Sequence, residues 1–432
     1  MKRHRATTTP HPGGRPARVV LAAALLSAGV AAQSDGWRAN ADIVARTSAR
    51  QPGFNYDEAA VGPYTLPDVL KGGRGRIGTP AEWKQHRPAV VELFRQHVYG
   101  RSPGRPEQLR FEVVAADPRA MDGAATLQRV AVLSTQAGRA HRFEVTIFLP
   151  NARKEPVPLF LLLNNRPATN ADPTRKEKSG FWPAEQAIAR GYGIAALQVS
   201  DLAPDDKDKY RDGVIRLFEG PSTAPRADDA WMALAAWAWG ASRVLDYAET
   251  NPRIDAQRVA VVGHSRGGKA ALWAGAEDER FAMVVSNESG EGGAALTRRN
   301  YGETLVRITE VFPHWFTRNY ARYAGRVADL PVDQHMLLAL SAPRALYVAS
   351  ADEDLWADPR GEFLSLSQTS PVYALWGEQE IRADEMPGLE RPLIRGKRGY
   401  HVRRGTHNLT PYDWDRFMDF GDRVWQSPSS RN

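Results

Sequence analysis

Short apolar runs alternate with stretches of helical periodicity along the middle of the chain. The runs 158–163, 192–199 and 258–262 are apolar at most positions, as is typical of parallel strands that are buried on both faces. Helix-forming stretches at 228–250 and 269–276 follow two of these runs. The alternation predicts an α/β fold in which helices cover both faces of a mostly parallel central sheet, a three-layer αβα sandwich.

The N-terminal part of the chain has a different pattern. From 33 to about 120, proline and glycine interrupt short helical stretches such as 80–98. The segments 128–134 and 141–148 alternate apolar and polar residues around a glycine-containing break, which predicts a β-hairpin. We expect residues 33–432 to form a single domain, in which 33–120 is an extension that packs on the core.

Two conspicuous stretches have structural interpretations. Trp231, Trp237 and Trp239 lie in the helical stretch 228–250 and are expected to be core aromatics rather than a ligand-binding set. The acidic loop 201–212 lacks the glycine-centred spacing of a calcium-binding loop. No metal site is therefore predicted.

The first 32 residues have the pattern of a secretory signal peptide. They carry five basic residues and no acidic one, followed by the apolar run 19–30 and the small residues Ala31 and Ala32. The apolar run is shorter than the roughly 20 residues that span a bilayer. We expect cleavage near Ala32 and a secreted or periplasmic protein without a membrane span, with an uncleaved anchor as the alternative.

Composition narrows the possible partners and chemistry. The net charge is +7, and removal of the five basic residues of the signal peptide leaves about +2. The basic runs 175–178 and 395–398 are interpreted as solvated loops, so no nucleic-acid partner is expected. Cysteine is absent, which excludes thiol catalysis, thiolate metal ligands and disulfide stabilisation.

Residues 263–267 read Gly-His-Ser-Arg-Gly and match the pattern G-x-S-x-G. The motif stands between the predicted strand 258–262 and the predicted helix 269–276, which is the setting of a nucleophile elbow where only small neighbours fit beside the serine. A phosphate-binding loop is the alternative, but neither glycine spacing of such loops is present. The motif predicts an α/β-hydrolase fold with Ser265 as the nucleophile.

A serine hydroxyl needs an imidazole to take its proton and a carboxylate to orient that imidazole. In this fold the chain order is serine, acid, histidine. His407 lies in a polar loop before the amphipathic stretch 411–425 and is the preferred base, whereas its rival His401 lies in an apparent strand. Glu288 and Asp354 each follow an apparent strand, and either acid or both can orient the imidazole.

These motifs resemble those of the glucuronoyl esterases, carbohydrate esterase family 15. The elbow of that family, G-x-S-R-x-G-K, is matched at 263–269, and its E-S-G-x-G-G stretch at 288–293. Its D-x-W and G-x-H motifs are matched at 354–356 and 405–407, and the resemblance covers roughly 160–420.

The resemblance is to the bacterial type of the family. The fungal branch carries a disulfide-bonded cysteine before the serine, where this chain has His264. The fungal branch relies on the acid that corresponds to Glu288, but this chain offers Asp354 as well. The identity of the main triad acid therefore stays open.

The resemblance implies a serine esterase that hydrolyses the ester between (4-O-methyl-)D-glucuronic acid on glucuronoxylan and a lignin alcohol, through a glucuronoyl-serine intermediate. Arg266, together with backbone N–H groups, would stabilise the oxyanion. Lys269 and Glu303 would bind sugar hydroxyls, and Trp356 would cover one face of the sugar ring. For each of these residues the structural alternative is a surface charge or a core aromatic.

Two other functions are compatible with parts of this pattern. An acetyl xylan esterase, or another α/β-hydrolase carboxylesterase or peptidase, would share the triad, but an acetyl group offers nothing for Lys269 to hold. A non-catalytic carbohydrate-binding relative would not need a complete set of serine, acid and histidine. We expect no cofactor, a glucuronoxylan or lignin-carbohydrate ester as the substrate, and a monomer.

Overall fold

The computed structural model describes residues 36–425, except 74 and 222–223. The predicted signal peptide at 1–32 therefore lies outside the described residues. No helix within the described ranges is long and apolar enough to cross a membrane.

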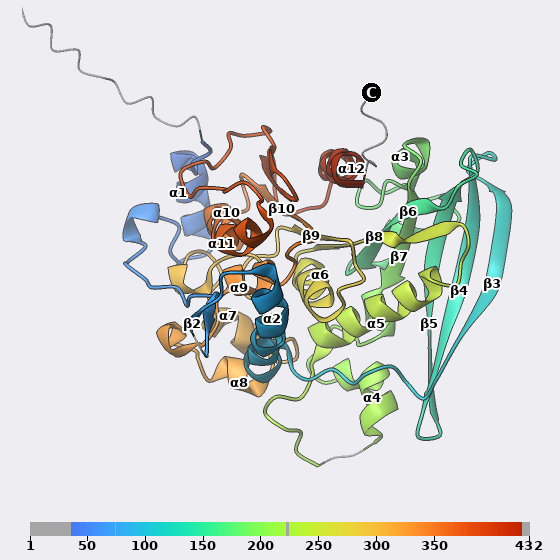
Figure 1. The fold of residues 1–432 in the computed structure, drawn as a ribbon, viewed down its shortest axis with the longest axis horizontal. Coiled ribbons are helices and arrows are strands. Elements are labelled where there is room, and N and C mark those ends of the chain that lie inside the picture. Colours follow the sequence, from blue (N-terminus) through green and yellow to red (C-terminus); the bar gives the residue numbers. More distant parts are fainter. Residues whose placement is uncertain (1–35, 74, 222–223, 426–432) are drawn as a thin grey trace, which may run out of the picture. The chain divides into compact units, whose positions relative to one another are not determined.

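A ten-stranded sheet forms the centre of the described part (Figure 1). Its strands follow the spatial order β11-β12-β10-β9-β8-β6-β7-β5-β4-β3. Neighbouring strands from β12 to β7 are parallel, whereas β11, β5, β4 and β3 are antiparallel to their neighbours. The strands are β3 (Gln108–Ala120), β4 (Ala125–Gln136), β5 (Arg139–Pro150), β6 (Val157–Asn164), β7 (Gly193–Gln198), β8 (Ile254–His264), β9 (Met283–Asn287), β10 (Ala345–Ala351), β11 (Leu393–Arg395) and β12 (Arg398–Arg403), beside a separate pair β1 (Lys71–Gly72) and β2 (Gly75–Arg76).

Helices cover both faces of this sheet. In Figure 1, α3 and α12 lie on one side of the central strands, and α5 and α6 lie on the other. The α-helices are α1 (Ala41–Arg50), α2 (Pro80–Phe94), α3 (Ala184–Ala189), α4 (Val214–Glu219), α5 (Ala233–Ala248), α6 (Arg266–Glu277), α7 (Leu305–Val311), α8 (Arg318–Ala321), α9 (Gln334–Ala339), α10 (Pro359–Ser367), α11 (Ser370–Tyr373) and α12 (Pro411–Trp425).

The continuous apolar strands supply two hydrophobic cores. On β6, Phe160 and Leu162 belong to the core that contains residues of α3 and α12, and Leu159, Leu161 and Leu163 belong to the core that contains residues of α5 and α6. All five side chains are fully buried. Because successive strand residues point to opposite faces, a strand covered on both faces must be apolar at every position. The predicted αβα arrangement is confirmed.

The predicted elements are present with changed bounds. The hairpin is confirmed as β4 and β5, and the predicted strand 258–262 is the second half of the longer β8. The helical stretch predicted at 80–98 is α-helical only to Phe94 and continues as a π-helical turn, Arg95–Tyr99. The bounds of the predicted domain and of its N-terminal extension stay a prediction.

The helix predicted at 228–250 begins only at Ala233. Met232 has an extended backbone, and the Ala233 N–H donates to the His314 carbonyl at 3.0 Å, a contact from a distant part of the chain. This tertiary hydrogen bond sets the start of α5, so Trp231 precedes the helix. Trp231, Trp237 and Trp239 are all buried, which confirms them as core aromatics.

We predict that Leu161→Ala lowers the free energy of unfolding by about 2–5 kcal/mol, because it removes buried methyl groups and leaves a cavity in the middle of β6. Urea denaturation followed by circular dichroism measures this loss. The matched control is Val113→Ala on the edge strand β3, where the side chain is 49% exposed, with an expected change within about 0.5 kcal/mol. Equal losses in the two variants would contradict the assignment of β6 as the centre of the core.

Candidate active site

Ser265 occupies a sharp turn between a strand and a helix. β8 ends at His264 and α6 begins at Arg266, and Ser265 itself has φ 57° and ψ −128°. This backbone conformation is strained for a residue other than glycine. A Cβ atom on Gly263 would lie 2.0 Å from the carbonyl oxygen of Gly267, so the turn requires glycine there. The local geometry is that of a nucleophile elbow.

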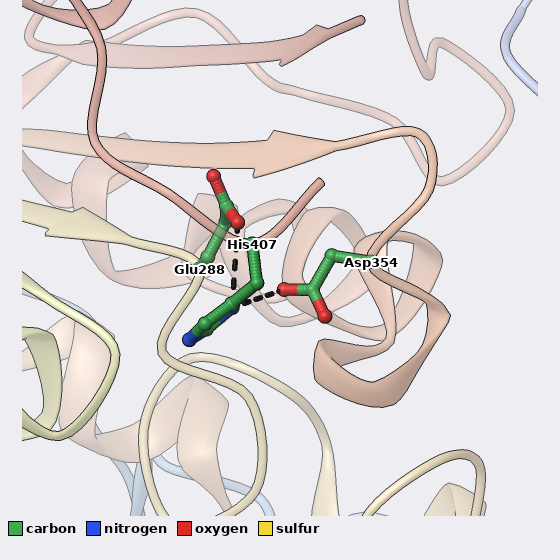
Figure 2. A group of neighbouring side chains, drawn as sticks. All are labelled: Glu288, Asp354 and His407. Carbon is green, nitrogen blue, oxygen red and sulfur yellow. Dashed lines mark hydrogen bonds and ion pairs between the residues drawn. The ribbon is translucent and has the colours of Figure 1, made fainter. Parts of the chain in front are cut away.

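His407 lies between two carboxylates in the loop that joins β12 to α12. Figure 2 shows its Nδ1 directed at both acids, 2.6 Å from Asp354 Oδ2 and 3.4 Å from Glu288 Oε2. Glu288 directly follows β9, and Asp354 follows β10. The side chain of His407 is 38% exposed, while both acids are buried. The imidazole therefore has its Nδ1 side toward the acids and a partly open surface.

Glu288 is held by other groups as well. Its Oε1 accepts a hydrogen bond from Arg403 Nη2 at 2.5 Å, and its Oε2 accepts from the Asn408 backbone N–H at 3.1 Å. Arg403 also pairs with the buried Asp413 at 2.9 Å. Asp354 is thus the nearer partner of His407, and Glu288 divides its charge between His407 and Arg403.

The two acids change how His407 titrates. Burial lowers the pKa of His407, but the carboxylates of Asp354 and Glu288 outweigh burial and raise the pKa to about 10. Burial raises the pKa of Glu288 to about 8, against the opposing effects of His407 and Arg403. The cluster therefore stabilises the imidazolium form, the form that a histidine takes when it accepts a proton from serine.

The same three side chains place one possible metal-ligand atom each within 4.8 Å of one another. The Arg403 guanidinium beside Glu288 would repel a cation there. The acid–imidazole hydrogen bond to Asp354 accounts for the closeness of the groups without an ion.

His264 connects the elbow to His407. The two imidazole rings lie 4.4 Å apart between centroids. His264 is fully buried, and its Nδ1 lies 2.7 Å from the Asn287 side-chain oxygen, so Nδ1 carries the proton. Nε2 then accepts from Arg166 Nη2 at 3.4 Å. Burial, with the positive charge of His407, keeps the pKa of His264 well below its usual value. A neutral ring with a fixed orientation thus packs against His407.

His401, the rival base, lies in the core. Its Nε2 is 2.8 Å from Asp413, and its Nδ1 is 3.0 Å from the Tyr347 hydroxyl. Its side chain is fully buried. A histidine with both ring nitrogens occupied and no exposed surface cannot receive a proton from Ser265.

Arg266 and Lys269 both lie in the first turn of α6. The Arg266 guanidinium forms an ion pair with Asp205 and lies over the Trp315 ring, 4.7 Å from its centroid. Lys269 is buried and donates to the Ser289 carbonyl, and its Nζ is 5.9 Å from the same indole. Burial lowers the pKa of Lys269. The charged groups of Arg266 and Lys269 therefore both lie near the Trp315 ring, beside the elbow.

Glu303 and Trp356 are joined by a backbone hydrogen bond, and an N-terminal segment packs beside them. The Glu303 N–H donates to the Trp356 carbonyl at 3.0 Å, and the Gly302 N–H donates to the Asn55 carbonyl at 2.9 Å. The Phe54 ring packs edge-on against the Trp356 indole, with centroids 4.8 Å apart. Phe54 therefore supports the Trp356 side chain, and Asn55 holds the backbone next to Glu303, the other residue expected to line the sugar pocket.

The structure brings all the expected site residues to one region but adds partners that sequence reasoning missed. The only sequence signal for Arg403 is its position at the end of the apparent strand that precedes His407. Asp205 lies in the acidic loop 201–212, where the pattern gave no reason to select one acid. Phe54 carries no local signal, because its contact with Trp356 joins distant parts of the chain.

The chain is similar in sequence to known proteins. Residues 132–377 match the family model of the fungal glucuronyl esterases. The chain is 38% identical over 415 residues to carbohydrate esterase MZ0003 from an unknown prokaryotic organism, covering 89% of this chain and 94% of the relative. It is 28% identical over 348 residues to 4-O-methyl-glucuronoyl methylesterase 1 of Wolfiporia cocos, covering 77% of this chain and 75% of the relative.

Solved structures are similar over most of the chain. A glucuronoyl esterase from Solibacter usitatus has 39% identity and a TM-score of 0.80, and the match covers 85% of this chain and all of that one. A family 15 glucuronoyl esterase from Teredinibacter turnerae has 33% identity and a TM-score of 0.79, with 88% and 94% covered.

We predict that Asp354→Asn lowers the pKa of His407 more than Glu288→Gln does, because Asp354 is the nearer carboxylate and Arg403 offsets the charge of Glu288. Imidazole resonances followed by NMR against pH measure the shift, with His407→Gln to assign the signal. In the unaltered protein the His407 resonance should titrate well above pH 6.5, which is about the usual pKa of a histidine. A larger shift in Glu288→Gln would reverse the ranking of the acids.

We also predict that Phe54→Ala raises KM for a glucuronate ester by about three- to tenfold, the worth of one aromatic pair. The value of kcat should stay within about twofold, because the altered contact lies away from the reacting atoms. The matched control is Phe111→Ala, which removes a similar edge-on contact with Tyr247 at the far end of the sheet. If both variants change KM equally, Phe54 does not support the pocket.

Proposed function

Because this chain belongs to the glucuronoyl esterase family, carbohydrate esterase family 15, we propose that it hydrolyses the ester between a (4-O-methyl-)D-glucuronic acid of glucuronoxylan and an alcohol of lignin. The observation that carries this proposal is the joint placement of the elbow and the acid–imidazole cluster at one edge of the sheet. The Asp354–His407 hydrogen bond of 2.6 Å orients the imidazole, and its ring lies against the residue that precedes Ser265.

In the first half of the proposed reaction, Ser265 Oγ attacks the carbonyl carbon of the uronate ester, and Nε2 of the neutral form of His407, which becomes more populated as the pH rises toward its pKa, takes the hydroxyl proton. Nδ1 keeps its own proton and, through it, donates a hydrogen bond to Asp354. The carbonyl oxygen becomes an oxyanion beside the Arg266 guanidinium and the backbone N–H groups of the elbow. Collapse of this intermediate expels the alcohol, which receives the proton from His407 and leaves a glucuronoyl-serine ester.

In the second half, water attacks the same carbonyl while His407 accepts its proton, and Ser265 leaves with that proton restored. The product is free glucuronic acid on the polysaccharide. Lys269 supplies a positive charge one helical turn beyond the serine, and Trp356 supplies an apolar face for the sugar ring. An acetyl ester uses neither group, so this set of residues favours a uronate over an acetate.

The proposal also covers the location, the oligomeric state and the cofactor requirement of the protein. The signal-peptide pattern of residues 1–32 supports secretion or export to the periplasm, where the plant polysaccharide is accessible. We propose that the protein acts as a monomer, without metal or organic cofactor, since the triad supplies nucleophile, base and charge stabilisation by itself.

We predict that the protein hydrolyses benzyl glucuronate and that Ser265→Ala abolishes this activity. Lys269→Met is expected to raise KM for benzyl glucuronate on the order of tenfold, the loss of a hydrogen bond to a charged group. It should leave hydrolysis of 4-nitrophenyl acetate within about twofold, because that ester has no sugar to bind. Initial rates on the two esters with the unaltered protein and both variants measure this.

Two outcomes would overturn parts of the proposal. Hydrolysis of the acetate without hydrolysis of the glucuronate would keep a serine esterase but remove the uronate as its substrate. Full glucuronate activity in Ser265→Ala would remove Ser265 as the nucleophile.

A further inference from the structure

The acidic loop 201–212 contains one carboxylate that is turned toward the elbow. Asp205 Oδ1 accepts hydrogen bonds from His314 Nε2 at 2.8 Å and from Trp315 Nε1 at 2.6 Å, and Oδ2 accepts from Arg266 Nη1. An indole N–H can only donate, so the orientation of this carboxylate is determined. Burial raises the pKa of Asp205, but its contacts with His314, Arg266 and Trp315 outweigh burial and lower it to about 2.

The Arg266 guanidinium is held by aromatic rings against its flat face, in addition to the hydrogen bond from its Nη1 to Asp205. Its guanidinium carbon lies 4.7 Å from the centroid of Trp315 and 5.3 Å from that of Phe312. The two aromatic rings stack on each other at 3.7 Å with nearly parallel planes. A planar cation on such a surface, with one nitrogen tied to a carboxylate, has little freedom to rotate.

We propose that Asp205 is the positioning residue of the oxyanion-stabilising guanidinium, so that Asp205, Trp315 and Phe312 together fix Arg266 at the elbow before substrate arrives. The inference rests on the proposed role of Arg266 in ester hydrolysis. Within the described part of the chain only Nη1 of Arg266 has a hydrogen-bond partner, Asp205, so the other N–H groups of the guanidinium are available to the substrate oxygen.

Preorganisation of Arg266 is the physical basis of this role. A donor that is already in place when charge develops on the oxygen needs no rearrangement at that moment, and this is where oxyanion stabilisation gains its effect. A free arginine side chain would lose rotamer entropy on each turnover. The negative charge of Asp205 weakens the positive potential of Arg266, so the benefit of the pair comes from position and must appear in kcat.

The test is a double-mutant cycle with Asp205→Asn and Arg266→Met, measured on benzyl glucuronate and 4-nitrophenyl acetate. Asp205→Asn alone should lower kcat on both esters by about ten- to a hundredfold, with KM within about twofold, since both reactions form an oxyanion. In the Arg266→Met background, Asp205→Asn should have almost no further effect. The control is Asp212→Asn in the same loop, which removes an exposed partner of Arg216 and should leave kcat unchanged.

Three results would overturn the proposal. They are an unchanged kcat in Asp205→Asn, an equal loss of kcat with and without Arg266, and a loss confined to KM. A thermal-unfolding midpoint for each variant separates loss of folded protein from loss of rate. The acetate ester keeps the test independent of substrate class, because failure of glucuronate hydrolysis with intact acetate hydrolysis overturns the proposed function and leaves the cycle on acetate to decide the role of Asp205.

Discussion

The parallel register of β8, β9, β10 and β12 is the constraint on which the site depends. His264 pairs with Asn287, and Asn287 pairs with Ala349, so these strands end at the same edge of the sheet. Ser265 and Glu288 are the next residues after their strands, while the second acid and the histidine leave the same edge from β10 and β12. A slip of one residue would turn every side chain of a strand to the opposite face. Two apolar cores oppose such a slip.

The charges at this edge form one connected group. His407 contacts Asp354 and Glu288, Glu288 contacts Arg403, and Arg403 contacts Asp413. Buried charges are costly unless each has a partner. The group is therefore understood as a means of fixing orientation around one exposed imidazole. It contributes specificity of arrangement, and the bulk of the folding free energy comes from the apolar layers on either side of the sheet.

The sequence predicted the features whose cause is local. Ser265 could be selected as the candidate nucleophile because a predicted strand, a glycine-rich turn and a predicted helix follow one another directly in the sequence. His407 could be preferred to His401 as the candidate base because His407 lies in a polar loop and His401 in a strand. The ranking of Glu288 and Asp354 required coordinates, since both follow strands of the same edge. Asp205 and Phe54 were missed because their partners Arg266 and Trp356 lie far along the chain, and the start of α5 was missed because a tertiary hydrogen bond sets it.

The contact between Phe54 and Trp356 implies that substrate selection and bond cleavage depend on different parts of the chain. The groups proposed to attack and protonate the ester come from the carboxyl ends of the central strands, whereas the ring behind the Trp356 indole, which is proposed to cover the sugar, comes from Phe54 near the start of the described residues. Selection can therefore vary the N-terminal segment, and with it the range of uronates that the enzyme accepts, while the chemistry of bond cleavage is inherited unchanged.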